Sequence, residues 1–223
     1  MAGRQGSAPA EAALAALCQT YWFPLYAFAR RLGHSPADSQ DLTQGFFAHL
    51  IESRLVAKAE AGKGKFRSFL LGAFKHFISH DRDHAVAQRR GGGETFVSLD
   101  TQNAEDLFSR DLATHFSPDA LFDRSWAMAV VDEASKLMES EFKETGRGLL
   151  IEKLFPCMQG DQGAQTYAEI AQALGTTEGT IKVTVSRMRR RYRDLLGLVV
   201  SQTVTSPGEV EEELQQLMAA LRG

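Results

Sequence analysis

The stretch Thr166–Leu196, TYAEIAQALGTTEGTIKVTVSRMRRRYRDLL, predicts two helices joined by a tight turn. Apolar residues recur at helical spacing in both halves and give each helix one core face. They are Tyr167, Ile170, Ala171 and Leu174, then Ile181, Val185 and Met188. Between the helices, Gly175 permits the left-handed backbone that ends a helix, and Thr177 is placed to cap the next one. Glu178 then falls in the first turn, where the helix dipole favours a carboxylate.

Positive charge covers the rest of the second helix. Its basic residues are Lys182, Arg187, Arg189, Arg190, Arg191 and Arg193. Only Asp194 opposes them after Glu178, so ion pairing within the helix does not account for the run. Small residues near the helix start would let the backbone approach DNA closely: Gly179, Thr180, Val183, Thr184 and Ser186. A core face opposite a cationic face is typical of a helix-turn-helix, whose second helix enters the major groove.

Composition indicates an ordinary globular protein in a reducing cytoplasm. Of the 223 residues, 43% are apolar and 24% charged, and we identify neither a membrane-length apolar run nor a signal peptide. The two cysteines, Cys18 and Cys157, are far apart, which excludes a disulfide framework. The net charge is −3, but positive charge concentrates in residues 63–90 and 182–193, and local fields decide where a polyanion binds.

The pattern of helical signals predicts an all-α protein of two helical domains. The first covers residues 10–90, with helices over 11–32, from Ser35-Pro36 onward, and over 66–90. A flexible linker is expected over 91–120, which includes one short candidate strand, Thr95–Leu99. The second domain covers 121–197, with helices near 121–145 and 148–158 before the helix-turn-helix. A helical C-terminal extension follows over 198–223, with an apolar stripe at Val210, Leu214, Leu217 and Leu221.

The predicted helix from Phe66 mixes aromatic and basic residues. Phe66, Phe69, Phe74 and Phe77 lie among Lys63, Lys65, Arg67, Lys75, Arg82, Arg89 and Arg90. Aromatic rings stack on unpaired bases while cations follow the backbone, so the mixture favours contact with single-stranded nucleic acid. Helical spacing places Phe74 and Phe77 in the core instead, and leaves Phe66 and Phe69 with either role.

Two motifs resemble a known family. DLTQGFF at Asp41–Phe47, followed by FRSFL at Phe66–Leu70, resembles the second conserved region of bacterial RNA polymerase sigma factors. The helix-turn-helix with EGTIK at Glu178–Lys182 resembles their fourth region. The order of the two motifs, with no third domain between them, resembles that of the extracytoplasmic-function group of sigma factors. The tail resembles that of the subset with C-terminal extensions.

The resemblance implies partners for the first domain. Asp41, Gln44 and Phe47 would contact the clamp helices of the β′ subunit of core RNA polymerase, and the loop Ala57–Gly64 would capture a base flipped from the minus-ten element. Contacts with the melted strand would come from Lys63, Lys65, Phe66, Arg67, Phe69, Lys75 and Arg82.

In the second domain, the resemblance implies reading of the minus-thirty-five element and contact with the β flap of the polymerase. Gly179 and Thr180 would present backbone amides to phosphate. The side chains that would contact the DNA are Lys182, Val183, Thr184, Ser186, Arg187 and Arg190.

The chain also departs from the family. Gly45 stands where the family often has glutamate, and glycine there costs about 1 kcal/mol of helix propensity. Gln40 occupies a site that is often acidic in the family. A phosphate on Ser39 or Thr43 would restore negative charge beside Asp41. The acidic tail offers a second means of control by folding onto one domain. The residues identify neither an anti-sigma factor nor a kinase.

Other chemistries fit the residues less well. His76, His80 and His84 form an i, i+4, i+8 stripe without the further ligands of a metal site, so no metal is expected. The loop Gly62–Lys65 lacks the upstream glycine and the Ser or Thr of a phosphate-binding loop. We expect no cofactor and no enzymatic activity. A stand-alone regulator that uses only the helix-turn-helix remains as the alternative function, and it would bind duplex promoter DNA tightly without polymerase.

Overall fold

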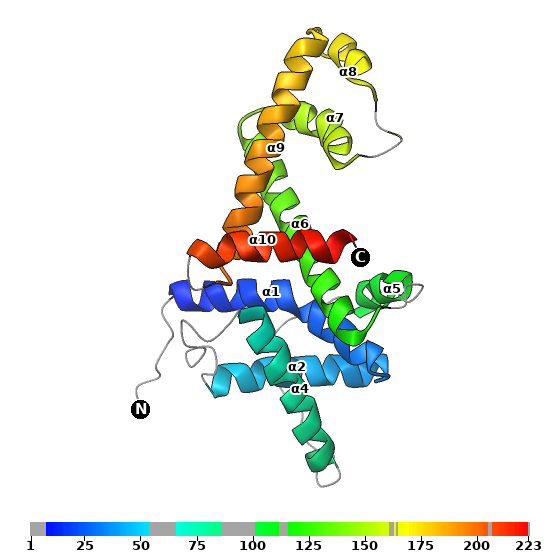
Figure 1. Ribbon diagram of the computed structural model, residues 1–223, viewed down its shortest axis with the longest axis vertical. Coiled ribbons are helices and arrows are strands. Elements are labelled where there is room, and N and C mark those ends of the chain that lie inside the picture. The colour runs from blue at the N-terminus through cyan, green and yellow to red at the C-terminus, as the bar shows by residue number, and fades with distance from the viewer. Residues whose placement is uncertain are drawn as a thin grey trace. The chain divides into compact units, whose positions relative to one another are not determined.

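A computed structural model describes residues 8–53, 66–85, 101–111, 116–160, 163, 165–204 and 207–222 of the chain. Within these residues every regular element is an α-helix, which confirms the predicted all-α class (Figure 1). No helix of this described part is long and apolar enough to cross a membrane. The segment Thr95–Leu99 and the loop Ala57–Gly64 lie outside the described residues.

The chain divides into two compact units. Unit 1 comprises Met1–Ala129 together with Ser201–Gly223, and unit 2 comprises Val130–Val200. Unit 1 therefore takes in more of the chain than the predicted first domain, because it includes residues 91–129 and the C-terminal segment.

The predicted signals mark the end of α1 and the start of α2 in unit 1. Helix α1 spans Ala8–Arg31, and Gly33 follows in the left-handed region with φ 95°. Helix α2 spans Pro36–Glu52, and the hydroxyl of its N-cap residue Ser35 accepts a hydrogen bond from the Asp38 amide at 3.1 Å. This cap satisfies one of the amides that a helix start leaves without a partner.

Aromatic side chains of three helices form the core of unit 1. Helix α4 spans Phe66–Ala85, and its Phe74 ring lies 5.0 Å from that of Phe46 in α2 and 6.1 Å from that of Phe28 in α1. All three rings are buried, as expected for Phe74. Phe77 is half-buried, with its ring 5.6 Å from that of Phe46.

Helix α5, Thr101–Asp111, lies within the segment predicted as a linker. Its Phe108 is buried with Ala27 and Leu121 in one cluster. Glu105 accepts hydrogen bonds from the Tyr26 hydroxyl at 2.5 Å and from Arg30 Nε at 2.7 Å. These contacts attach the segment to α1, whereas the sequence predicted a flexible connection.

The C-terminal extension is helical, as predicted. Helix α10 spans Pro207–Arg222 and belongs to unit 1 together with the first part of α6, which spans Pro118–Glu144. Leu217 of the predicted apolar stripe is buried, and Val210, Leu214 and Leu221 are half-buried. The buried set also includes the carboxylate of Glu213.

Unit 2 consists of the second part of α6 and three further helices: α7 (Gly148–Gln159), α8 (Tyr167–Ala173) and α9 (Glu178–Ser201). Helix α9 continues beyond Gly197, where the sequence placed the domain end. The core of unit 2 includes Val130, Ala134, Met138 and Phe142 of α6, Ile151 and Leu154 of α7, Ile170 and Ala171 of α8, and Ile181, Val185, Met188, Leu195, Val199 and Val200 of α9. The apolar faces predicted for the helix-turn-helix thus supply its core, except that Tyr167 and Leu174 are only half-buried.

Candidate nucleic-acid interface

The turn between α8 and α9 is built from local hydrogen bonds. Gly175 has φ +64°, which a residue with a side chain rarely adopts, so the predicted glycine stop is confirmed. The Thr177 hydroxyl accepts the Thr180 amide at 3.2 Å and therefore caps α9 as predicted. Helix α8 has a capping box that the sequence analysis overlooked: Thr166 and Glu169 each accept a backbone amide from the other. The Thr-x-x-Glu spacing was the available signal.

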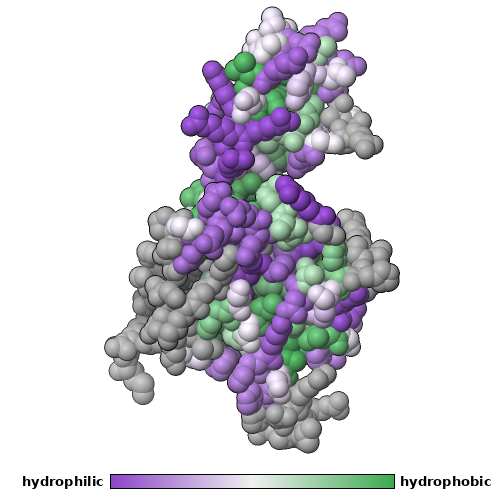
Figure 2. All heavy atoms as spheres, viewed as in Figure 1, coloured by the Kyte–Doolittle hydropathy of each residue, from purple (hydrophilic) through white to green (hydrophobic). Residues whose placement is uncertain are grey.

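The predicted DNA-contacting side chains lie on the outer face of α9. Lys182, Ser186, Arg187 and Arg190 are exposed, and Val183 has 51% of its surface exposed. Gly179 and Thr180 are exposed at the helix start, whereas Thr184 is half-buried and donates to the Thr180 carbonyl at 2.8 Å. Hydrophilic residues gather over α9 in the space-filling view (Figure 2). This face combines cations with one exposed apolar side chain, the kind of group that packs on a thymine methyl.

Two of the basic side chains on α9 already have partners. Lys182 Nζ lies 2.7 Å from Glu178, and this pair raises the lysine pKa. Arg191 binds Glu141 of α6 with two hydrogen bonds, the Nε bond measuring 2.9 Å. Of these two pairs, Lys182–Glu178 lies within α9 and Arg191–Glu141 joins α9 to α6, so pairing within the helix involves one residue of the basic run. Arg187, Arg189, Arg190 and Arg193 form no ion pair with any residue that the structure describes.

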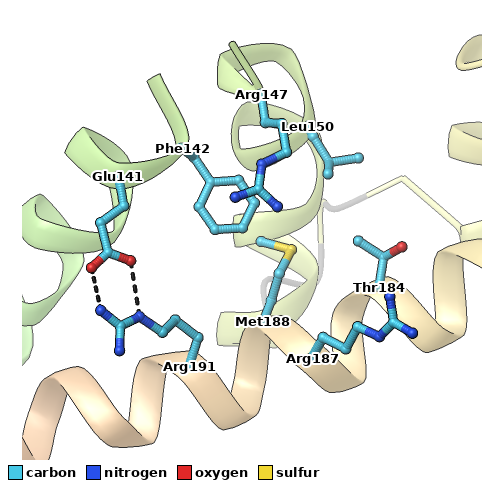
Figure 3. Close-up of a pocket in the computed structure, with 8 residues that line it drawn as sticks. All are labelled: Glu141, Phe142, Arg147, Leu150, Thr184, Arg187, Met188 and Arg191. Carbon is cyan, nitrogen blue, oxygen red and sulfur yellow. Dashed lines mark hydrogen bonds and ion pairs between the residues drawn. The ribbon is translucent and has the colours of Figure 1, made fainter. Parts of the chain in front are cut away.

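A pocket of about 350 Å³ lies between α6, α7 and α9 of unit 2. Phe142, Leu150 and Met188 give it an apolar lining, while Arg147, Arg187 and Arg191 surround it with positive charge (Figure 3). The Arg147 guanidinium lies 4.6 Å from the centre of the Phe142 ring. Thr184 and Glu141 also line the pocket, and Glu141 pairs with Arg191, so two residues predicted to contact DNA, Thr184 and Arg187, border this cavity.

The polymerase-contact residues predicted on α2 differ in exposure. Asp41 is exposed and Gln44 half-buried, while Leu42 and Phe46 are buried, as the helical spacing predicts. Phe47 has only 7% of its surface exposed, and its ring packs 6.1 Å from that of Phe46. Phe47 therefore belongs to the packed core. Of the three predicted contacts, Asp41 and Gln44 are the two that solvent reaches.

The hydroxyls proposed for phosphorylation are not on the surface. Ser39 and Thr43 are both fully buried, and the Thr43 hydroxyl donates to the Ser39 carbonyl at 2.7 Å. Thr43 can make this bond because it lies one turn after Ser39. A kinase could not reach either oxygen without unfolding α2, so the burial of both hydroxyls argues against this form of control.

The residues predicted to contact single-stranded DNA have diverse surroundings. Phe66 and Phe69 are half-buried, with ring centres 6.3 Å apart. Lys75 is exposed but forms an ion pair with Asp119. Arg67 is 5% exposed and lies in a cluster of acceptors that the sequence analysis did not foresee. Lys63, Lys65 and the side chain of Arg82 lie outside the described residues.

The histidine stripe is partly described. His76 and His80 are exposed, with ring centres 4.3 Å apart, and the side chain of His84 lies outside the described residues. In the described part of the chain no three His, Cys, Asp or Glu residues are grouped so that they could hold a metal ion.

Comparison with protein-family models, curated proteins and solved structures found no match for this chain.

Proposed function

We propose that this protein is a promoter-specificity subunit, a sigma factor of the extracytoplasmic-function type, for bacterial RNA polymerase. The observation that carries the proposal is the outer face at the start of α9. It presents Arg187, Arg190 and Val183 to solvent, and the two arginines form no ion pair with described residues. Such a face suits the major groove, where arginine binds guanine edges and apolar groups contact thymine methyls.

The α2–α4 region supports this role over that of a simple repressor or activator. Asp41 is an exposed carboxylate on a helix whose motif resembles the polymerase-binding region of the family. Helix α4 carries Phe66 and Phe69, half-buried rings with part of their surface available to unpaired bases. Unit 1 would bind the core enzyme and the melted minus-ten strand, while α9 of unit 2 would bind the minus-thirty-five element.

In this mechanism the protein forms no covalent bond and needs no cofactor. Unstacking bases costs a few kcal/mol per step, and contacts of the extruded bases with the protein offset that cost. The chain would act in the cytoplasm, where the polymerase is.

The discriminating experiment compares duplex binding with and without core polymerase. We expect the chain alone to bind promoter duplex weakly. With core polymerase it should form a salt-resistant complex in which thymines of the minus-ten region become reactive to permanganate. Tight binding of duplex by the chain alone, with no opening and no effect of polymerase, would instead identify the stand-alone regulator.

A further inference from the structure

Arg67 is the second residue of α4, and its guanidinium is bound on every side. Nε donates to Glu213 Oε2 at 3.1 Å, Nη2 donates to Gln216, and Nη1 donates to Asp123. Its carbon lies 4.3 Å from the centre of the Trp126 ring. Only 6% of the Arg67 side chain is exposed, and only 3% of the Glu213 side chain. An arginine predicted to meet a DNA strand is thus occupied by the protein itself.

The acceptors of Arg67 come from two helices, and each helix binds a different part of the guanidinium. Helix α6 supplies Asp123, which is 45% exposed and binds Nη1. Helix α10 supplies Glu213 and Gln216, which take the Nε–Nη2 edge. That edge is the fork with which arginine binds a carboxylate or a phosphate through two parallel hydrogen bonds. Glu213 and Gln216 therefore present their oxygens to the edge of Arg67 that is suited to a phosphate.

Part of the core of the α1, α2 and α4 helices forms without α10. Phe74 packs on both Phe28 and Phe46, and these three residues come from those three helices. Among the side chains of α10 that the structure describes, Leu217 is the one fully buried apolar group. A buried ion pair such as Arg67–Glu213 contributes little net stability, because desolvation of both charges offsets their attraction. Displacement of α10 by a competing polyanion is therefore physically accessible.

We propose that α10 is a displaceable cover that imitates the nucleic-acid backbone. When it is docked, the Nε–Nη2 edge of Arg67 is closed; when it leaves, a phosphate of single-stranded DNA takes that edge while the nearby rings of Phe66 and Phe69 meet the bases. The proposal rests on the proposed function of α4 as a path for the melted strand. It adds that the C-terminal helix controls entry to that path.

The test compares two charge reversals on α10 in the full chain. Glu213→Arg places a cation against Arg67 and should undock the helix, whereas Glu211→Arg makes the same change in net charge at an exposed position. Affinity for a short fluorescent single-stranded oligonucleotide is measured for both variants and for the unaltered chain. Glu213→Arg should bind about tenfold more tightly than Glu211→Arg, as expected if the docked state outweighs the open one about nine to one. Circular dichroism confirms that both variants are folded.

A second measurement needs no substitution. Hydrogen exchange of the unaltered chain should show that amides of α10 exchange faster when the oligonucleotide is present, while those of α2 do not. If Glu213→Arg does not fold, this exchange result decides the question by itself. Equal affinities of the two variants, or unchanged protection of α10 in a bound complex, would refute the cover alone and leave the proposed function standing. Absence of oligonucleotide binding by every variant would refute both the cover and the single-strand role of α4.

Discussion

Three neighbouring arginines on α9 should respond differently to replacement by alanine, because the structure gives them different surroundings. Arg187 and Arg190 are exposed without an ion pair to described residues, while Arg191 is held by Glu141. If Arg187 contacts a base edge, Arg187→Ala costs about 1–3 kcal/mol on the preferred sequence, or about 5- to 150-fold in affinity. A promoter mutated at the contacted base should show little further loss.

The two other replacements provide matched controls for charge. Arg190→Ala should weaken binding to all duplexes evenly and reduce the slope of log affinity against log salt by about one unit. Arg191→Ala should have the smaller effect on DNA. It should also lower the free energy of unfolding by at most about 1 kcal/mol, because Arg191 and Glu141 are 47% and 38% exposed and solvent screens their attraction.

The assay measures affinity for duplexes containing each base at the minus-thirty-five positions, across a range of salt concentrations, in the presence of core polymerase. Thermal denaturation of each variant accompanies it. If all three replacements weaken every duplex equally, Arg187 does not read bases. If Arg191→Ala reduces affinity most while stability is unchanged, its pairing with Glu141 does not persist in the complex.

Three other predictions concern unit 1. Asp41→Lys should abolish association with core polymerase in gel filtration. Glu52→Lys, an exposed charge reversal on the same helix, should not. Equal behaviour of the two variants would exclude α2 as the contact. Gly45→Ala should raise the free energy of unfolding by up to about 1 kcal/mol, because alanine favours a helix. The added Cβ would lie 3.5 Å from the Phe77 ring, which is not a clash. A lower melting temperature would contradict this prediction. Hydrogen bonds from Arg30, and then from Tyr26, hold the pKa of Glu105 below its ordinary 4.5 although burial opposes them, so the contribution of Glu105 to stability is complete above pH 4.5 and is lost as the pH falls further. Glu105→Gln should flatten the acid limb of the stability profile, and an unchanged limb would show that this carboxylate does not couple to folding.

Local signals in the sequence predicted the helices well. Gly33, the Ser35-Pro36 start, Gly175 and Thr177 act through hydrogen bonds and backbone angles within a few residues, so their effects can be foreseen without a fold. Apolar spacing likewise predicted the core side of α9.

Contacts between distant parts of the chain could not be predicted in this way. Glu213 is 146 positions from Arg67, and nothing near Arg67 indicates that a buried carboxylate will meet it. Helix α5 was missed because its surroundings are rich in polar residues, and its attachment depends on Glu105 meeting Arg30, 75 positions away. The burial of Ser39 and Thr43 also depends on packing, since both are small polar residues that sequence alone assigns to the surface.

Transcription from a promoter library by reconstituted polymerase tests the central claim most directly. Core polymerase is combined with this chain, and the transcripts are sequenced to find their start sites. The proposed function predicts that transcripts appear only when the chain is present, and that they start downstream of a shared pair of minus-thirty-five and minus-ten elements. It also predicts that Arg187→Ala changes the minus-thirty-five preference. If no start site depends on the chain while the same preparation binds core polymerase, the protein is not a sigma factor.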